Sequence, residues 1–292
     1  MAFRTRGWYR DRWMEWFNGS LNSAPAPAAA DVSQHLERLI RRDRLIAACA
    51  VAILTLFAWM YLGRMAVAMR AAATEAEMHA AMGMTGMDAW RPGDIASLFV
   101  MWIVMMAGMM LPSAAPMILL VASTHRRQGG PRARIRTAAF ATGYLVAWTE
   151  FSLAAALVQV ALHAGALMSS SMATQSTRVS GAIFLAAGVY QWLPWKHSCL
   201  THCRSPLHFL SEHWREGVSG AFTLGLQHGL FCIGCCWVLM ALLFAAGVMN
   251  LGWVAAIGAL VLVEKVLRHG PLVGRVAGVL FVAWGMYLVT LA

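Results

Sequence analysis

Residues 219–245 read SGAFTLGLQHGLFCIGCCWVLMALLFA, an apolar stretch long enough to cross a bilayer as one helix. The whole chain has the same character, because 60% of its 292 residues are hydrophobic and only 12% are charged. Soluble domains average about 25% charged residues. The sequence therefore predicts an integral membrane protein of the all-α class.

Seven apolar segments have the length of spanning helices, which predicts a polytopic bundle of about seven transmembrane helices. They are residues 45–63, 95–121, 138–162, 179–195, 219–245, 251–267 and 271–291. Pro112 and Pro116 predict a kink or an early end in the second segment. Residues 45–292 are expected to form one transmembrane domain.

The net charge of +10 is distributed in a way that predicts topology. If the segments alternate across a membrane, 19 of the 23 Lys and Arg fall on the side of the N-terminus. The positive-inside rule then places the N-terminus inside and the C-terminus outside. Membrane topology accounts for the positive charge, so nucleic-acid binding is not needed to explain it. Membrane lipid is the expected partner. No site for signal-peptide cleavage follows the first segment.

Residues 1–44 are expected to form a cytoplasmic arm and linker. Residues 3–17 mix aromatic side chains with arginines, which suits a segment lying on the inner membrane surface; a disordered arm is an equal alternative. Residues 20–30, rich in Ala and Pro, predict a flexible linker.

The fifth apolar segment carries an unusual set of soft metal ligands. On a helix, one face would present His228, Cys232, Cys235, Cys236 and Met240. Imidazole, thiolate and thioether together favour Cu(I), with Zn(II) as the second choice. Polar clusters inside a membrane core are usually functional. The alternative is packing, because cysteine also behaves as a small hydrophobe.

A second group of ligands lies in the predicted inner loop between the fourth and fifth segments. It comprises His197, Cys199, His202 and Cys203, enough for a four-coordinate site, although the spacing matches no common zinc finger. Two alternatives stay open: a solvated polar loop, or a redox pair formed by the two cysteines.

Methionines mark two further regions. Met105 and Met109 lie on one face of the second segment, together with Met101; core packing is the alternative interpretation. The predicted outer loop gathers Met78, His79, Met82, Met84 and Met87, a set suited to capturing copper where thiols would oxidise. An amphipathic surface helix is the alternative there.

Other polar residues in apolar segments are secondary candidates. Glu150 is expected to act as a proton relay or ion partner, or to be protonated and hydrogen-bonded to Gln191 or His228. Glu264 and Lys265 end the sixth segment and are expected to mark the membrane interface. Gly270, Gly274 and Gly278 predict a close-packing face for a neighbouring helix or a second subunit.

Three motifs together resemble a known family. They are Trp102-x-x-Met105-x-x-Gly108-Met109-Met110-x-Pro112-x-x-x-Pro116, Tyr190-Gln191-x-x-Pro194-x-Lys196-x-x-Cys199-Leu200-x-x-Cys203-Arg204-x-Pro206 and Gly225-x-x-x-Gly229-x-x-Cys232-x-Gly234-Cys235-Cys236-Trp237-x-Leu239-Met240. With Glu264-Lys265, the likeness covers roughly residues 95–267. It resembles the bacterial family named domain of unknown function 2182, described as predicted metal-binding integral membrane proteins. The resemblance implies a bound metal ion and a multi-pass protein of the bacterial inner membrane.

The first functional interpretation is a membrane protein that binds Cu(I) and delivers or transports it, exchanging the ion with a soluble metal chaperone or a metalloenzyme. Its ligands must lose their protons to bind, so occupancy should fall at low pH. A thiol–disulfide electron relay and an assembly factor for a metalloenzyme are the alternatives. The chain has no phosphate-binding G-x-x-x-x-G-K-[ST] motif and neither H-E-x-x-H nor G-x-S-x-G, which argues against an ATP-driven pump or a hydrolase.

Overall fold

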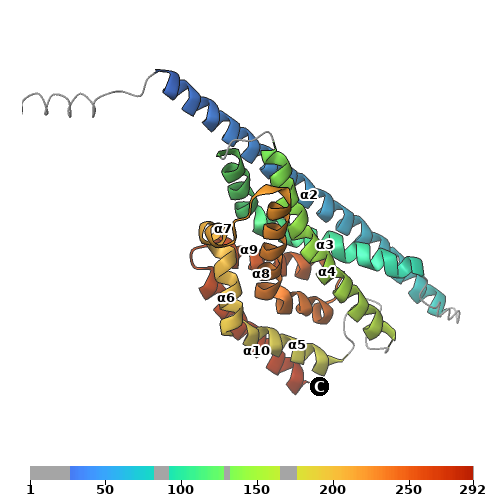
Figure 1. Ribbon diagram of the computed structural model, residues 1–292. Coiled ribbons are helices and arrows are strands. Elements are labelled where there is room, and N and C mark those ends of the chain that lie inside the picture. Colours follow the sequence, from blue (N-terminus) through green and yellow to red (C-terminus); the bar gives the residue numbers. More distant parts are fainter. Residues whose placement is uncertain (1–26, 82–91, 128–131, 165–175, 292) are drawn as a thin grey trace, which may run out of the picture.

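The computed structural model describes residues 27–81, 92–127, 132–164 and 176–291, in which every regular element is an α-helix (Figure 1). The all-α prediction is confirmed for these residues. The helices are α2 (Pro27–Ala81), α3 (Pro92–Arg127), α4 (Ala133–Ala164), α5 (Thr177–Tyr190), α6 (Pro194–Arg204), α7 (Pro206–His213), α8 (Gly217–Ala246), α9 (Leu251–Val266) and α10 (Gly270–Thr290).

Five of these helices are long and apolar enough to cross a membrane: α2, α3, α4, α8 and α10. This is compatible with a multi-pass membrane protein. The fourth and sixth predicted segments correspond to shorter helices, since α5 has 14 residues and α9 has 16. At 1.5 Å per residue both are shorter than a hydrocarbon core of about 30 Å.

Helix α2 is much longer than its apolar segment. It begins at Pro27, inside the predicted linker, and continues to Ala81, through much of the predicted outer loop. The flanks are rich in Ala, Arg, Glu and Met, which favour helix in water as well as in lipid. The apolar segment therefore predicts which part of this helix can lie in a bilayer. It does not predict where the helix begins and ends. Residues 1–26 of the predicted arm lie outside the described residues.

Two other elements differ from the predictions. Residues 196–218, predicted as a loop, contribute instead to the short helices α6 and α7, each with a proline in its first turn. Proline suits that position because the first helical N–H needs no partner within the helix. Helix α3 runs through Pro112 and Pro116 to Arg127, so an early end at these prolines is wrong.

Helix α8 lies in the interior of the bundle and packs along α4, while α2 pairs with α3 and α5 with α10 (Figure 1). The α4–α8 approach depends on glycine. A methyl group on Gly225 would collide with the backbone of Phe140, and one on Gly143 with the backbone of Phe222. Small residues of this kind let two helix backbones touch.

The glycines of α10 are covered within the chain itself. Gly274 faces the Glu264 carboxylate, and Gly278 faces Gln191 and the α5 backbone at Gly188. The predicted close-packing face is therefore used by neighbouring helices of the same molecule, and a homo-oligomer stays a prediction.

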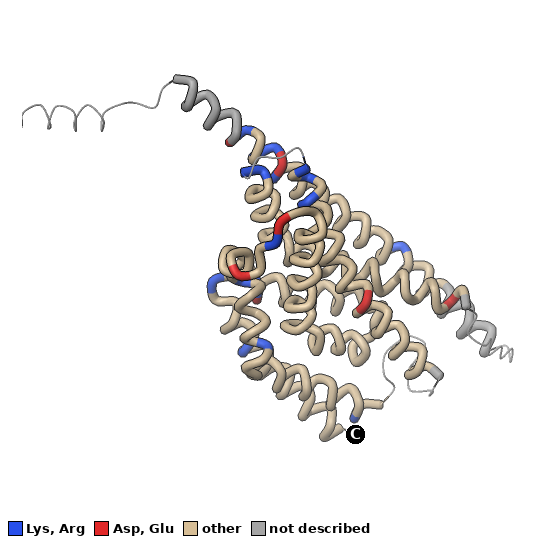
Figure 2. The backbone as a smooth tube through the Cα atoms, in the orientation of Figure 1, with Lys and Arg blue, Asp and Glu red and all other residues tan. Residues whose placement is uncertain are grey.

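Lys and Arg positions gather at the end of the bundle where the described part of α2 begins (Figure 2). There the buried carboxylate of Asp43 binds Arg126 at the end of α3 and, at 3.0 Å, Arg134 at the start of α4. Two arginines on one carboxylate tie three helices together at this end.

Candidate metal centre

Three buried cysteines lie midway along α8, where the close α4–α8 contact shields them. Cys232 and Cys236 are fully buried and Cys235 is 1% exposed. The thiols of Cys235 and Cys236 both donate to the Cys232 carbonyl oxygen, each at 3.0 Å. The predicted helical face is thus formed, with Met240 buried one turn further along.

His228 precedes these cysteines by one turn and lies in an aromatic cage. Its ring centroid is 5.3 Å from that of Phe209, 5.7 Å from Tyr144 and 6.0 Å from Phe140. Its Nδ1 is buried and has no hydrogen-bond partner in the described structure. A buried polar atom normally has a partner, so an unpaired imidazole nitrogen beside thiols suits a metal ligand.

Two polar groups from other helices approach the Cys232 sulfur. Lys265 Nζ of α9 lies 2.8 Å from it and the Tyr144 hydroxyl of α4 lies 3.1 Å from it. Tyr144 also reaches the Met110 carbonyl oxygen at 3.2 Å, and Lys265 donates to the Ser113 hydroxyl at 3.3 Å. The ammonium group provides a positive charge that can balance a thiolate where water is excluded.

Helix α6 brings the second pair of cysteines to the same place. The Cys203 thiol lies near that of Cys235. Cys199 packs on α8 at Gly234, where an added methyl group would lie 2.8 Å from the Cys199 sulfur. The two cysteine groups, predicted as separate sites, therefore adjoin each other across the α6–α8 contact.

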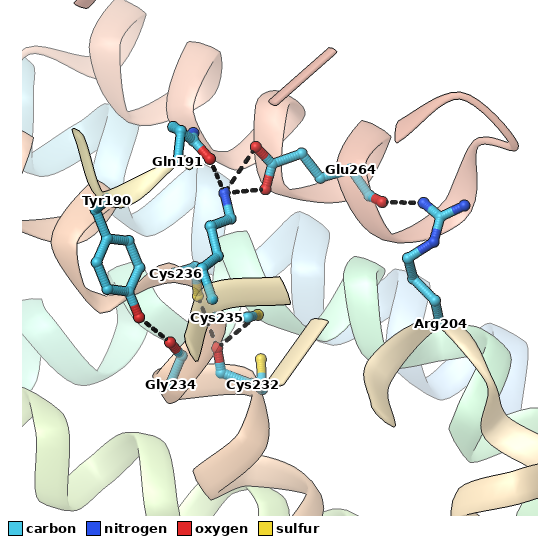
Figure 3. A network of polar contacts seen from close by, with 9 residues as sticks. Tyr190, Gln191, Arg204, Cys232, Gly234, Cys235, Cys236 and Glu264 are labelled. Atoms are coloured by element: carbon cyan, nitrogen blue, oxygen red, sulfur yellow. Dashed lines mark hydrogen bonds and ion pairs between the residues drawn. The ribbon is translucent and has the colours of Figure 1, made fainter. Parts of the chain in front are cut away.

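A buried polar network holds α6 in this position (Figure 3). Lys196 Nζ lies 2.7 and 2.9 Å from the two carboxylate oxygens of Glu264 and also donates to Gln191. The Arg204 guanidinium donates to the backbone carbonyl of Glu264, at the other end of α6. Both ends of α6 are thus attached to α9.

Glu264 and Lys265 were expected to mark the membrane interface. Both are buried among the helices, with 1% and 8% exposure, and their depth in the membrane stays a prediction. Each charge has a partner inside the bundle, Lys196 for Glu264 and the Cys232 region for Lys265. Buried charges persist only when paired in this way.

The protonation of two α6 side chains bears on metal binding. Burial raises the pKa of the Cys199 thiol, and nearby Cys235 raises it further. Burial lowers the pKa of His197, with a further lowering from the charges of Arg275 and Lys196. At neutral pH a metal ion at Cys199 must therefore displace a proton, whereas the His197 imidazole is neutral.

The other candidates lie on α4, on α6 and at the end of α5. His202 stacks on Phe231, with ring centroids 4.3 Å apart. Glu150 is exposed on α4, and its expected role as a proton relay or ion partner stays a prediction. Gln191 is buried and binds Lys196 instead.

The methionines of α3 are part of the packed interior. Met105 and Met109 are 1% and 3% exposed, and Met109 lies against Gly258 of α9. Of the predicted outer cluster, Met82, Met84 and Met87 lie outside the described residues, and only the helical backbone is described at Met78 and His79. Copper capture by this cluster stays a prediction.

The donors adjoin one another without forming a finished coordination shell. Within the described ranges, no group of three or more His, Cys, Asp or Glu side chains is arranged to hold a metal ion. Two of the thiols are instead turned toward a backbone carbonyl. A change of side-chain rotamer is enough to redirect a cysteine sulfur.

Sequence reasoning missed Tyr144 and Lys265 as neighbours of Cys232. Lys265 carried a signal, since it is a charge directly following Glu264 within an apolar segment. Tyr144 carried none, because nothing in a single sequence aligns α4 with α8.

The match to protein families bears on the whole of this region. A family model described as PpoB2, copper chaperone, matches residues 99–288. The chain belongs to this copper chaperone family. The matched range contains five of the six cysteines, with His228 and Lys265, and it leaves out residues 1–44 and the methionines at 78–87. Comparison with curated proteins and with solved structures gives no match.

Family membership favours copper as the metal that the protein handles, and it gives no support to zinc. The motif resemblance to domain of unknown function 2182 stays a prediction.

Proposed function

We propose that the protein is an integral membrane copper chaperone that holds Cu(I) between α6 and α8 and passes it on by ligand exchange. The observation that supports this most directly is the packing of Cys199 on α8 at Gly234, with Cys203 near Cys235 and the unpaired His228 Nδ1 close by. Soft sulfur donors from two elements, with an imidazole nearby, are the ligands that Cu(I) selects.

The arrangement suggests how an ion would be held. Binding removes a proton from each thiol used, because the thiolate is the ligand. Two thiolates around one Cu(I) carry a net negative charge, which Lys265 is placed to offset at the Cys232 sulfur. Cys199 and Cys203 are partly exposed, whereas the α8 cysteines are buried, so we propose that the ion moves between the two sets.

Such a chaperone could act as an assembly factor that delivers copper to a metalloenzyme. A soluble metal carrier is the other candidate partner. A thiol–disulfide relay is the second candidate function, favoured by the nearness of Cys203 to Cys235. In a relay these two thiols would be oxidised to a disulfide and pass two electrons and two protons to an acceptor disulfide. A chaperone keeps its thiols reduced and metal-bound, so the two functions predict different products.

For the membrane arrangement we propose seven spans, with the N-terminus inside, the C-terminus outside and the protein in the bacterial inner membrane. Helices α5 and α9 would be short spans packed between longer ones. The basic cluster around Asp43 would then lie on the inner side, as the positive-inside rule requires. Reporter fusions after Arg127 and Ala292 test this: the first should report the inside and the second the outside.

The copper content of the purified protein tests the proposed function. The chain is purified in detergent under reducing conditions, supplied with Cu(I), freed of unbound metal and analysed by mass spectrometry for copper and zinc. The variants are Cys232→Ser/Cys235→Ser/Cys236→Ser and Cys199→Ser/Cys203→Ser. The matched control is Cys49→Ser, which changes an exposed cysteine of α2.

Stoichiometric copper is expected in the wild type and in the control, with loss from both sets of variants. Full copper retention in the α8 triple variant would overturn the site assignment. A metal-free protein in which Cys203 and Cys235 cycle between thiol and disulfide would favour the relay instead.

A further inference from the structure

Three histidines from three helices gather beside the cysteine cluster, around two phenylalanines. His202 of α6 stacks on Phe231 of α8, with centroids 4.3 Å apart and planes inclined by 5°. His213 of α7 stacks on Phe209 at 4.8 Å. Phe209 in turn contacts the ring of His228 at 5.3 Å, so this group adjoins the buried end of the candidate metal centre.

Both outer histidines have a fixed tautomer. His202 Nδ1 lies 2.8 Å from the Ser198 carbonyl oxygen, and His213 Nδ1 lies 3.2 Å from the Phe209 carbonyl oxygen. A carbonyl oxygen only accepts, so each Nδ1 donates its hydrogen, and in a neutral ring Nε2 then carries a lone pair. Metal-binding histidines are commonly oriented by this bond to a backbone carbonyl.

The separation of the two rings suits one shared ion. The ring centroids of His202 and His213 are 6.3 Å apart. Two imidazoles bound end-on to one ion, with metal–nitrogen bonds of about 2.0–2.1 Å, have ring centres roughly 6 Å apart. Both side chains are partly exposed, whereas His228 is 3% exposed, so the pair lies between solvent and the buried donors.

We propose that His202 and His213 form a second Cu(I) site, made of nitrogen donors alone, at which the ion is held on its way to or from His228 and the cysteines. Transfer is ligand exchange. A copper–nitrogen bond forms as the bond from copper to a cysteine sulfur, or to the molecule that delivers the ion, breaks. Copper stays Cu(I) throughout. The direction of transfer rests on the proposed function, but the existence of the site does not.

The test uses the full chain in detergent, titrated with Cu(I) supplied as a chromogenic bicinchoninate complex. The variants are His202→Phe and His213→Phe, which retain a flat ring for stacking and lose the nitrogen ligands. The matched control is His208→Phe, which changes an exposed histidine paired with Glu212 on α7. Bound copper is counted, and X-ray absorption at the copper edge distinguishes nitrogen from sulfur ligands.

The wild type should bind one more copper equivalent than either variant, and the extra ion should have a nitrogen shell. The His208→Phe control should match the wild type. Equal stoichiometry in all four proteins would overturn the proposal, as would a sulfur shell for the ion lost in His213→Phe. If a variant does not fold, the wild type alone still decides, because the second equivalent must show nitrogen neighbours.

The same titration separates this inference from the proposed function. In the Cys232→Ser/Cys235→Ser/Cys236→Ser background the nitrogen-bound ion should remain while sulfur-bound copper is lost. Sulfur-bound copper without a nitrogen-bound ion would overturn the histidine site alone. Nitrogen-bound copper with no sulfur-bound ion in the wild type would overturn the proposed cysteine site alone.

Discussion

Replacing Glu264 with Gln tests the network that holds α6 against α8 and α9. The carboxylate faces Lys196 at 2.7 and 2.9 Å, and both side chains are 1% exposed. Removing one partner of a buried ion pair leaves the other charge uncompensated, at a cost of about 3–5 kcal/mol. Because native proteins are stable by only about 5–15 kcal/mol, Glu264→Gln should melt at a clearly lower temperature.

Two further variants make this prediction specific. Lys196→Met/Glu264→Leu removes both charges and should recover most of the lost stability, since apolar replacement of a buried pair is commonly neutral. Glu212→Gln breaks the exposed pair with His208 and should leave the melting temperature unchanged.

Unfolding is followed by tryptophan fluorescence in detergent, together with the alkylation rate of the partly exposed cysteines. Glu264→Gln should speed alkylation of Cys199 and Cys203, because α6 loses one of its attachments to α9. A Glu264→Gln protein that melts like the wild type, or a double variant as unstable as the single one, would show that this ion pair does not hold α6 in place.

Three other substitutions probe the site. Gly234→Val places side-chain atoms where α8 meets Cys199. The variant should lower the stability of the fold by about 1–3 kcal/mol and expose the Cys199 thiol to alkylation. An unchanged melting curve would count against this close approach. Tyr144→Phe removes a hydroxyl at 3.1 Å from the Cys232 sulfur and should cost about 1 kcal/mol of stability, measured by melting, while copper stoichiometry is retained. Lys265→Met removes the cation beside Cys232. It should weaken Cu(I) binding about tenfold or more in chelator competition, because one close charge contact is lost. An unchanged affinity would show that the ammonium does not offset thiolate charge.

The apolar segments predicted the helical class and the places of the helices, because burial in lipid demands long uncharged stretches. They did not predict helix ends. Helix α2 continues beyond its apolar part because Ala-rich and charged flanks also form helix, and α6 and α7 are too short and polar for a hydropathy pattern to show.

The spacing within α8 predicted that His228 and the three cysteines share one face, since this depends only on helix geometry. The approach of Cys203 to Cys235 depends on how α6 packs, which is fixed by Lys196 and by a glutamate 68 residues away. A single sequence does not contain such pairings. For the same reason the sequence did not predict that Glu264 pairs with Lys196 in the interior.

The most direct test of the shared α6–α8 site is X-ray absorption at the copper edge, on protein loaded with one equivalent of Cu(I). We expect a shell with at least two sulfur neighbours in the wild type. We also expect fewer sulfurs in both Cys199→Ser/Cys203→Ser and Cys232→Ser/Cys235→Ser/Cys236→Ser. A sulfur shell that is unchanged when the α6 cysteines are replaced would contradict a site formed jointly by the two helices.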